Sequence, residues 1–257
     1  MTGWLRQYGP AVAVFVGAIV VWEGAVRGLQ IQKFLLPPPS SILGALIEEW
    51  PILSQAGLRT MFEAAGGFVI GVVAGLVAAV VTARYAFART TLMPFAVAAN
   101  AIPIVAFAPI MNNWFGLTSP LSKMMIVAML VFFPVMINTV RGLTSASAAT
   151  LELMRSYAAS ESEVFRKVRV PAALPYFFTA LKIGATLSII GAIVGEYFGG
   201  APVVLGRIIV ENAAFLRFSV AWAAIIIGAA VGISVYLVIV AIERHVMPWH
   251  ASIRGGR

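Results

Sequence analysis

The chain alternates between long apolar runs and short polar connections, and the lengths of the runs indicate the fold. Six runs stand out: Pro10–Val26, Phe62–Ala83, Leu92–Met111, Leu121–Val140, Phe177–Tyr197 and Val220–Ile242. Each approaches the about 20 residues that a helix needs to cross the hydrocarbon core of a bilayer. Because backbone polar groups in lipid must be satisfied within the segment, the runs are predicted to be helices. The expected fold class is an all-α membrane protein with about six transmembrane helices.

The composition supports a membrane location. Hydrophobic residues make up 61% of the chain and charged residues 11%, whereas a soluble domain carries about a quarter charged residues. An unusually apolar soluble α-protein is the disfavoured alternative. The formal net charge of +8 would also suit nucleic acid, but in a membrane protein it more often reflects cytoplasmic loops rich in Lys and Arg. We therefore expect this chain to contact membrane lipid and not nucleic acid.

The distribution of basic residues predicts the orientation. With the N-terminus in the cytoplasm, eleven Lys and Arg residues fall on the cytoplasmic side and six outside, leaving out Lys182 within the fifth run. Positive residues favour the cytoplasmic side, so both termini are expected there. The first run is followed by Arg27 and Gly28 without a small-x-small cleavage site and is interpreted as a retained helix.

One transmembrane domain is expected over 1–257, with a first span and outer amphipathic segment (1–56), a core (57–242) and a cytoplasmic tail (243–257).

In the stretch LLPPPSSI, three prolines cannot continue a helix. Ser40 and Ser41 are predicted to cap a short amphipathic helix that runs to about Trp50 on the outer surface. A plain linker is the alternative.

Small residues recur at four-residue spacing inside the spans. In the second run these residues are Gly67, Gly71, Gly75 and Ala79. The fifth run has Gly191 and Gly195, and the sixth run has Gly228 and Gly232. Such spacing gives a smooth helix face where another backbone approaches closely. The glycines are therefore predicted to pack helices, within one copy or between two; direct contact with a substrate is the alternative.

A charged segment, 146–171, separates the fourth and fifth runs. It is predicted to form two short helices with a tight bend near Ala158–Ser160, because Ser160 and Glu163 make a capping box. Pro171 is expected to end the second helix, and Pro175 to begin the fifth span. Mixed charge beside an apolar ridge suits a groove in another protein. An amphipathic helix on anionic lipid is the alternative, which the two glutamates disfavour.

Several kinds of chemistry are excluded by missing residues. The chain has no Cys and no Asp, no GxxxxGK[ST] loop and no HExxH motif, so no metal site, no nucleotide site of the usual type and no catalytic role are expected. Lys182 and Ser188 are six residues apart and fall on different helix faces, which disfavours a Ser-Lys dyad.

Polar residues inside spans are costly and are therefore candidates for a translocation path. The candidates are Asn100, Pro103, Asn138 and Glu196. Asn100 alternatively hydrogen-bonds another helix, and Glu196 alternatively anchors its helix at the outer interface. Lys182 is expected to snorkel to the cytoplasmic surface.

The charged segment resembles the signature of import-type ABC transporter permeases. That signature reads Glu-Ala-Ala, three residues, Gly, nine residues, Ile-x-Leu-Pro. Here Glu152-Leu153-Met154, Ala158, Val168 and Val170-Pro171 stand at these places with matching spacing. The stretches NAIPIVAFAPIMNNWFG, VPAALPYFFTALKIG, IVGEYFGG and MPWH are similar to the nitrate, sulfonate, taurine and pyrimidine-precursor or riboflavin branch of these permeases.

The resemblance implies a non-catalytic permease that acts as a homodimer in the bacterial plasma (inner) membrane. Its implied partners are two copies of a cytoplasmic ATPase, which bind ATP and Mg, and an external solute-binding protein; this chain holds no cofactor. The segment 146–171 would be the coupling helix region that sits on the ATPase. The implied coupling residues are Glu152, Arg155, Ala158, Ala159, Ser160, Phe165, Arg166 and Pro171.

The expected solute is an aromatic heterocycle such as riboflavin or a thiamine pyrimidine precursor, with nitrate, taurine or an alkanesulfonate as the alternative. Two other functions stay open. A stand-alone secondary carrier or channel would not need the signature segment, and a membrane scaffold would show no flux.

Overall fold

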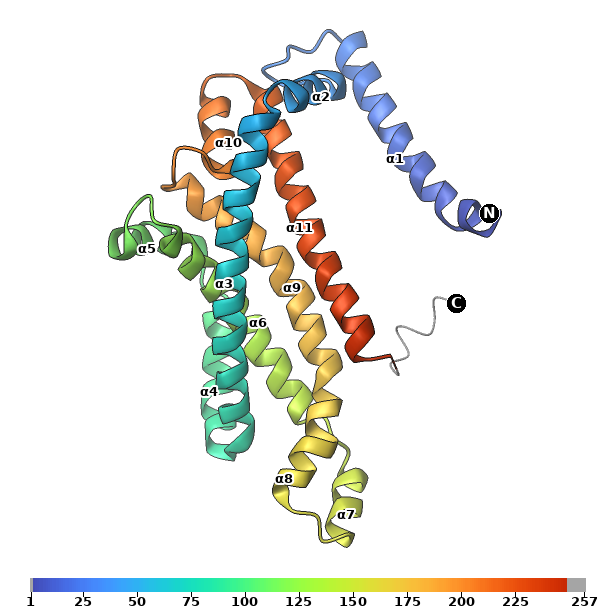
Figure 1. The fold of residues 1–257 in the computed structure, drawn as a ribbon, viewed down its shortest axis with the longest axis vertical. Coiled ribbons are helices and arrows are strands. Elements are labelled where there is room, and N and C mark those ends of the chain that lie inside the picture. Colours follow the sequence, from blue (N-terminus) through green and yellow to red (C-terminus); the bar gives the residue numbers. More distant parts are fainter. Residues whose placement is uncertain (1, 249–257) are drawn as a thin grey trace.

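The structure, a computed structural model, describes residues 2–248, which form helices joined by turns without a strand in that range (Figure 1). The prediction of an all-α membrane protein is confirmed. The long helices are α1 (Thr2–Gly28), α3 (Trp50–Arg84), α6 (Pro120–Leu143), α9 (Val170–Tyr197) and α11 (Phe218–Val246). The shorter elements are α2 (Pro39–Glu48), α4 (Ala86–Ala99), η1 (Ile104–Phe107), α5 (Ala108–Phe115), α7 (Ala148–Ser156), α8 (Glu161–Val164), η2 (Phe165–Arg169) and α10 (Leu205–Ala214).

The long helices run between two ends of the molecule. One end carries α2 and α10, and we call it the α2–α10 end; the other carries α7 and α8, and we call it the α7–α8 end (Figure 1). Helices α3, α6 and α11 run from the first end to the second, whereas α1 and α9 run the opposite way. Within residues 2–248, five stretches are long and apolar enough to cross a membrane. One of them, Glu161–Tyr197, is 37 residues long and includes α9.

The third predicted span, Leu92–Met111, is not a continuous helix. It is divided among α4, η1 and α5, with non-helical residues from Asn100 to Pro103. Pro103 supplies no backbone N–H and disfavours helical geometry in the residue before it, which explains the break. The three pieces still return the chain from the α7–α8 end, where α4 begins, toward the α2–α10 end, where α6 begins (Figure 1).

Helix α6 lies at the centre and packs against α3 and α9. A Cβ added at Gly67 would lie 2.5 Å from the Met124 carbonyl oxygen, and one at Gly71 would lie 2.6 Å from that of Ala128. On α9, a Cβ at Gly191 would lie 2.6 Å from Leu130 Cδ1. Gly67 and Gly71 therefore lie where the backbone of α3 approaches that of α6 too closely for any side chain. Gly191 on α9 instead lies against the Leu130 side chain, with the Val127 Cα 3.4 Å from an added Cβ.

Gly75 and Gly195 continue these two contacts. A Cβ at Gly75 would meet the Phe132 carbonyl oxygen at 2.8 Å, and one at Gly195 would meet Ile126 Cδ1 at 3.0 Å. Each glycine thus faces α6 from its own helix.

The expectation that Pro171 ends the second short helix is wrong. Helix α8, the π-helical turn η2 and α9 follow one another without interruption from Glu161 to Tyr197. In η2 the Val170 N–H donates to the Phe165 carbonyl, five residues back. A π turn shifts the pattern of backbone hydrogen bonds by one residue. Such a local shift lets a helix continue through a proline, which has no N–H to donate. Pro171 therefore lies in the first turn of α9.

The short helix expected after the three prolines is present as α2, but its predicted caps are wrong. Pro38 occupies the N-cap position and no side chain caps the helix. Ser40 instead contacts α1: its Oγ donates to Glu23 at 2.8 Å, and its backbone N–H donates to the same carboxylate at 3.0 Å. This link joins α2 to α1, which is otherwise largely exposed.

The close approach of α3 to α6 leads to a first prediction. We expect Gly67→Ala to lower the free energy of unfolding by about 1–3 kcal/mol, the usual cost of overpacking a tight contact. The measurement is the thermal unfolding midpoint of the purified protein in detergent. Gly44→Ala in α2 is the matched control, since a Cβ there meets nothing within 4 Å. Equal midpoints for the two variants would contradict the packing described.

Candidate functional site

The charged helix pair, which we define as α7, the bend that follows it and α8, projects from the bundle at the α7–α8 end (Figure 1). Neither helix has a fully buried residue. Leu153 and Tyr157 expose 54% and 74% of their surfaces. Exposed apolar side chains on a projecting helix pair are typical of a surface that contacts a partner.

The bend is a Schellman motif closed by an alanine. The Ala159 N–H donates to the Met154 carbonyl at 3.0 Å, and the Ala158 N–H donates to the Arg155 carbonyl at 2.9 Å. This pair of bonds places the second-last residue of the motif in the left-handed region, which glycine normally occupies. Ala158 has a φ of +52°, so the alanine adopts the backbone conformation for which the signature uses glycine.

Helix α8 begins with the predicted capping box. The Glu163 N–H donates to Ser160 Oγ at 3.3 Å, and the Ser160 N–H donates to Glu163 Oε2 at 3.0 Å. Glu163 also receives a hydrogen bond from Lys167 Nζ at 3.0 Å. The cap and the ion pair fix the direction in which α8 leaves the bend.

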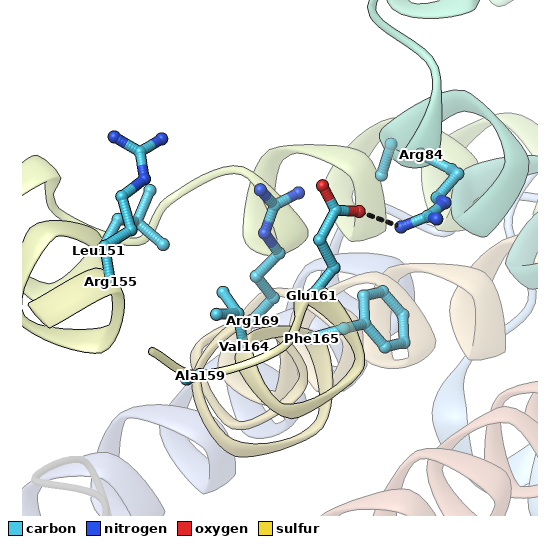
Figure 2. A pocket seen from close by; sticks show the side chains of 9 residues that line it. Arg84, Leu151, Arg155, Ala159, Glu161, Val164, Phe165 and Arg169 are labelled. Carbon is cyan, nitrogen blue, oxygen red and sulfur yellow. Dashed lines mark hydrogen bonds and ion pairs between the residues drawn. The ribbon is translucent and has the colours of Figure 1, made fainter. Parts of the chain in front are cut away.

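A cavity of about 220 Å³ lies between the charged helix pair and the end of α3 (Figure 2). Arg84 of α3 donates to Glu161 at 2.6 Å and so ties α3 to α8. Arg155 from α7 and Arg169 from η2 also line the cavity, and in Figure 2 the Arg169 side chain extends beside Glu161. Three guanidinium groups and one carboxylate give the cavity a net positive charge, which favours acidic groups on whatever covers it.

The predicted coupling residues lie together on this segment, and most of them face solvent. Ala159 and Phe165 are partly buried and line the cavity. The exposed members are Glu152, Arg155, Ala158, Ser160, Arg166 and Pro171.

The candidates for a translocation path are not brought together. Asn100 ends α4 and is exposed, as is Pro103 at the break that follows. Asn138 donates to the Pro134 carbonyl of its own helix at 2.8 Å. Among residues 2–248 no hydrogen bond joins Asn100, Asn138 or Glu196 to one another. The break at Asn100–Pro103 places non-helical backbone inside a predicted span, which proteins tolerate where it lies against protein or lines a water-filled cavity.

Glu196 is buried at the α2–α10 end and holds three helices together. Its carboxylate accepts from Thr60 Oγ1 of α3 at 2.7 Å and from the Gly206 N–H of α10 at 2.6 Å. The Leu205 N–H donates to Thr60 Oγ1 at 3.1 Å. Two free N–H groups at the start of α10 are thus satisfied, one by the Glu196 carboxylate and one by the Thr60 hydroxyl. Glu196 is not exposed at the interface as an anchoring residue would be.

Two charged residues beside Glu196 are missing from the sequence-based set of candidates. Glu63 of α3 is 3% exposed and Lys123 of α6 is 0% exposed, and both lie within electrostatic reach of Glu196. Lys123 Nζ donates to Asn112 Oδ1 at 3.1 Å and to the Leu117 carbonyl. Both residues fall inside predicted spans, at the second position of Phe62–Ala83 and the third of Leu121–Val140. That position is the signal the sequence offers, although both residues stand at the edge of a run, where span boundaries are uncertain by a few residues.

Lys182 does not snorkel as predicted. Its Nζ donates to both carboxylate oxygens of Glu243 at 3.0 Å, which joins α9 to α11. The partner lies 61 residues away and just beyond the last predicted span. The C-terminal end of the tail, from residue 249 on, lies outside the described residues, and so does part of the MPWH stretch.

The sequence of the chain matches a known family. The family described as "Binding-protein-dependent transport system inner membrane component" matches residues 71–248. This is more than half of the chain, which therefore belongs to that family of ABC importer permeases. The chain is accordingly a multi-pass inner-membrane transport component that works with an ATPase and a binding protein.

Curated relatives show which permeases are similar. The riboflavin transport system permease protein RibX of Chloroflexus aurantiacus is 30% identical over 91% of this chain and 87% of its own length. The formylaminopyrimidine transport permease protein ThiX of Halalkalibacterium halodurans is 33% identical over 72% of this chain and 74% of its own. The taurine transport system permease protein TauC of Escherichia coli is 24% identical over 97% and 92%.

The left-handed alanine in the bend leads to a second prediction. We expect Ala158→Gly to stabilise the charged helix pair by about 1 kcal/mol, because a left-handed conformation costs an L-residue about 1–2 kcal/mol and glycine almost nothing. The measurement is slower hydrogen exchange of the amides from Ala158 to Glu163. Ala159→Gly is the control, since Ala159 has no positive φ and its replacement is expected to speed exchange. If Ala158→Gly speeds exchange as well, the strain described at the bend is absent.

Proposed function

We propose that the chain is the membrane subunit of an ATP-driven importer and that its charged helix pair docks in a groove of a cytoplasmic ATPase. The observation that carries this proposal is that the pair is exposed and that α8 continues through η2 into α9. A movement imposed on α8 is therefore passed directly to a membrane helix.

The chemistry of the segment supports docking on protein in preference to lipid. Leu153 and Tyr157 supply apolar contact area, and Glu152 lies beside them on α7. Arg155 and Arg169 line the cavity, and their charge suits acidic side chains of the ATPase. A surface made for anionic lipid alone would not place Glu152, Glu161 and Glu163 among its basic groups.

The mechanism we infer is rigid-body. When the partner ATPase binds ATP and Mg, its two copies move together. This movement would reach α8 and then α9. The membrane helices then rock between two states in which the path opens to one side or the other. A homodimer of this subunit would place one charged helix pair on each ATPase copy. No step of chemical catalysis is assigned to this chain.

The solute we propose is an aromatic heterocycle such as riboflavin or a thiamine pyrimidine precursor. The support is that RibX and ThiX, at 30% and 33% identity, carry those solutes in their names. Taurine, an alkanesulfonate or nitrate is the second candidate, since relatives named for these solutes cover similar lengths of this chain. A stand-alone carrier is disfavoured because it has no use for a docking segment.

The charge of Glu152 provides a third prediction. In the complex with its ATPase and binding protein, we expect Glu152→Arg to lower ATPase stimulation by loaded binding protein at least about tenfold, equal to ~1.4 kcal/mol. Co-purification of the ATPase is measured in parallel. Glu48→Arg, the same change at an exposed position of α2 at the opposite end, is the control for co-purification of the ATPase, which it should leave unchanged. Unchanged stimulation and assembly in a folded Glu152→Arg variant would remove the support for docking through this segment.

The orientation provides a fourth prediction, which uses the lack of native cysteines. Leu29 at the α2–α10 end is 75% exposed and Phe87 at the α7–α8 end is 81% exposed. In intact cells a membrane-impermeant maleimide should label Leu29→Cys, and it should label Phe87→Cys only after permeabilisation. The reverse pattern would place the termini and the charged helix pair outside, where no ATPase could reach them.

A further inference from the structure

Helix α8 reaches the membrane helices by two routes. One is the chain itself, which continues through η2 into α9. The other is the ion pair between Arg84, the last residue of α3, and Glu161, the first residue of α8 (Figure 2). In the described part of the chain, this ion pair is the one polar contact between α3 and the charged helix pair. Helix α8 is therefore attached to α9 covalently and to α3 through Arg84.

A second glutamate of the same helical run contacts α3 at the other end of the molecule. The run Glu161–Tyr197 begins with Glu161 and carries Glu196 as its second-last residue. Glu196 accepts a hydrogen bond from Thr60 Oγ1, near the start of α3, at 2.7 Å. Glu161 accepts one from Arg84, at the end of α3, at 2.6 Å. The run is thus joined to α3 by a carboxylate at each of its ends.

The Arg84–Glu161 pair is too exposed to stabilise the isolated chain by much. The two side chains expose 59% and 83% of their surfaces, and an ion pair in water is worth about 0–1 kcal/mol. An ATPase that covers the charged helix pair would remove water from around Glu161, and the attraction between opposite charges grows as the surroundings become less polar. The pair therefore becomes stronger in the complex, where it has a movement to transmit.

The other charges of the cavity offset the loss of water around Glu161. Arg155 and Arg169 line the same cavity of about 220 Å³, and the Arg169 side chain extends beside Glu161 (Figure 2). A carboxylate among three guanidinium groups is attracted by all of them, so burying it costs less than burying a lone charge. The cavity thus favours a closed Arg84–Glu161 pair when a partner covers it.

Without this ion pair, a movement of α8 would act on α9 alone. Helix α9 packs closely on both of its neighbours: a Cβ added at Gly184 would lie 3.2 Å from Phe68 Cε2 of α3, and one at Gly195 would lie 3.0 Å from Ile126 Cδ1 of α6. Close-packed surfaces do not deform continuously, so α9 could slide along α3 only by breaking such contacts. If Arg84 draws α3 along with α8, the contacts between α3 and α9 are kept.

We propose that Arg84 is a positioning residue for transport, whose ion pair with Glu161 makes α3 and the run Glu161–Tyr197 move as one unit when the ATPase acts on the charged helix pair. This inference rests on the proposed function, because it assumes that an ATPase moves that pair. Arg84 lies outside the segment 146–171, so the resemblance to the permease signature does not select it. The geometry of the cavity does.

The test uses the complete complex with its ATPase and binding protein in proteoliposomes, and the readout is solute taken up per ATP hydrolysed. The solute is riboflavin, formylaminopyrimidine or taurine, whichever the wild type takes up. We expect Arg84→Gln to lower this ratio at least about fivefold, within the range by which residues between two sites alter their coupling. Arg84→Lys should stay within about twofold of the wild type, because a single nitrogen of Arg84 bonds the carboxylate.

Two controls separate positioning from folding and docking. Arg89→Gln, the same change at an exposed arginine of α4 that does not line the cavity, should behave like the wild type. The unfolding midpoint of Arg84→Gln and its co-purification with the ATPase should also match the wild type, since an exposed ion pair contributes little to stability. An unchanged ratio in Arg84→Gln would overturn the proposal. So would loss of the ATPase from this variant, which would make Arg84 a docking contact.

A cross-link tests the link without relying on charge. The chain has no native cysteine, so Arg84→Cys combined with Glu161→Cys carries the only two thiols of this subunit. We expect this double variant to show the low ratio, and a bifunctional maleimide that spans the two positions to raise the ratio at least about threefold. The same reagent should not change either single-cysteine variant. If the cross-linked subunit is no better than the unlinked one, α3 and α8 do not move together and the proposal is wrong.

The wild type tests the proposed function separately. If it shows no ATP-dependent uptake of riboflavin, formylaminopyrimidine, taurine, an alkanesulfonate or nitrate, the importer proposal fails, and the role of Arg84 fails with it. If the wild type transports one of these solutes and Arg84→Gln has the same ratio, only the role of Arg84 is wrong.

Discussion

The close approach of α6 to α3 and α9 is the contact on which the other features depend. Lipid is as apolar as the side chains, so helices in a bilayer gain little from hiding apolar surface and rely on van der Waals contact at short range. Gly67, Gly71 and Gly191 permit that range. Gly195 adds a second effect, because a Cβ there would lie 3.3 Å from Lys123 Cγ. The absence of a side chain at Gly195 therefore leaves room for the buried Lys123 side chain.

Buried charge at the α2–α10 end is stabilised by groups from five elements. Lys123 comes from α6, Glu63 and Thr60 from α3, Glu196 from α9, Asn112 from α5 and the Gly206 N–H from α10. Removing one partner of a buried charge usually costs about 3–5 kcal/mol, because the other charge is left uncompensated. The elements at this end are therefore held in one arrangement by polar contacts, whereas the middle of the bundle is held by packing.

The sequence was sufficient where the controlling interaction is local. Hydropathy located five long helices, and Ser160 with Glu163 located the start of α8, because a span and a capping box need only neighbouring residues. It failed where the outcome depends on distant residues. The accommodation of Pro171 requires a π turn that hydropathy does not register, and the interruption at Pro103 lies within an apolar run.

Tertiary partners explain the remaining differences. The glycine spacing indicated a smooth helix face but did not identify α6 as the helix against it. Nothing local shows that Lys182 meets Glu243, and Ser40 was expected to cap α2 because the Glu23 carboxylate on α1 is not adjacent in sequence. Glu63 and Lys123 are absent from the predicted site for a different reason: each stands at the edge of its apolar run, where a charge is easily assigned to a loop.

The uninterrupted run from Glu161 to Tyr197 has a mechanical consequence. Its 37 residues, at about 1.5 Å each, make a rod ~55 Å long. A rod of that length that tilts by about 10° about one end displaces the other by roughly 10 Å, several times the length of a hydrogen bond. Because Glu196 lies at the far end of this rod and binds the start of α10, α10 and the connection before it would be carried along. A small rotation at one face of the membrane would thus become a displacement as wide as a helix at the other.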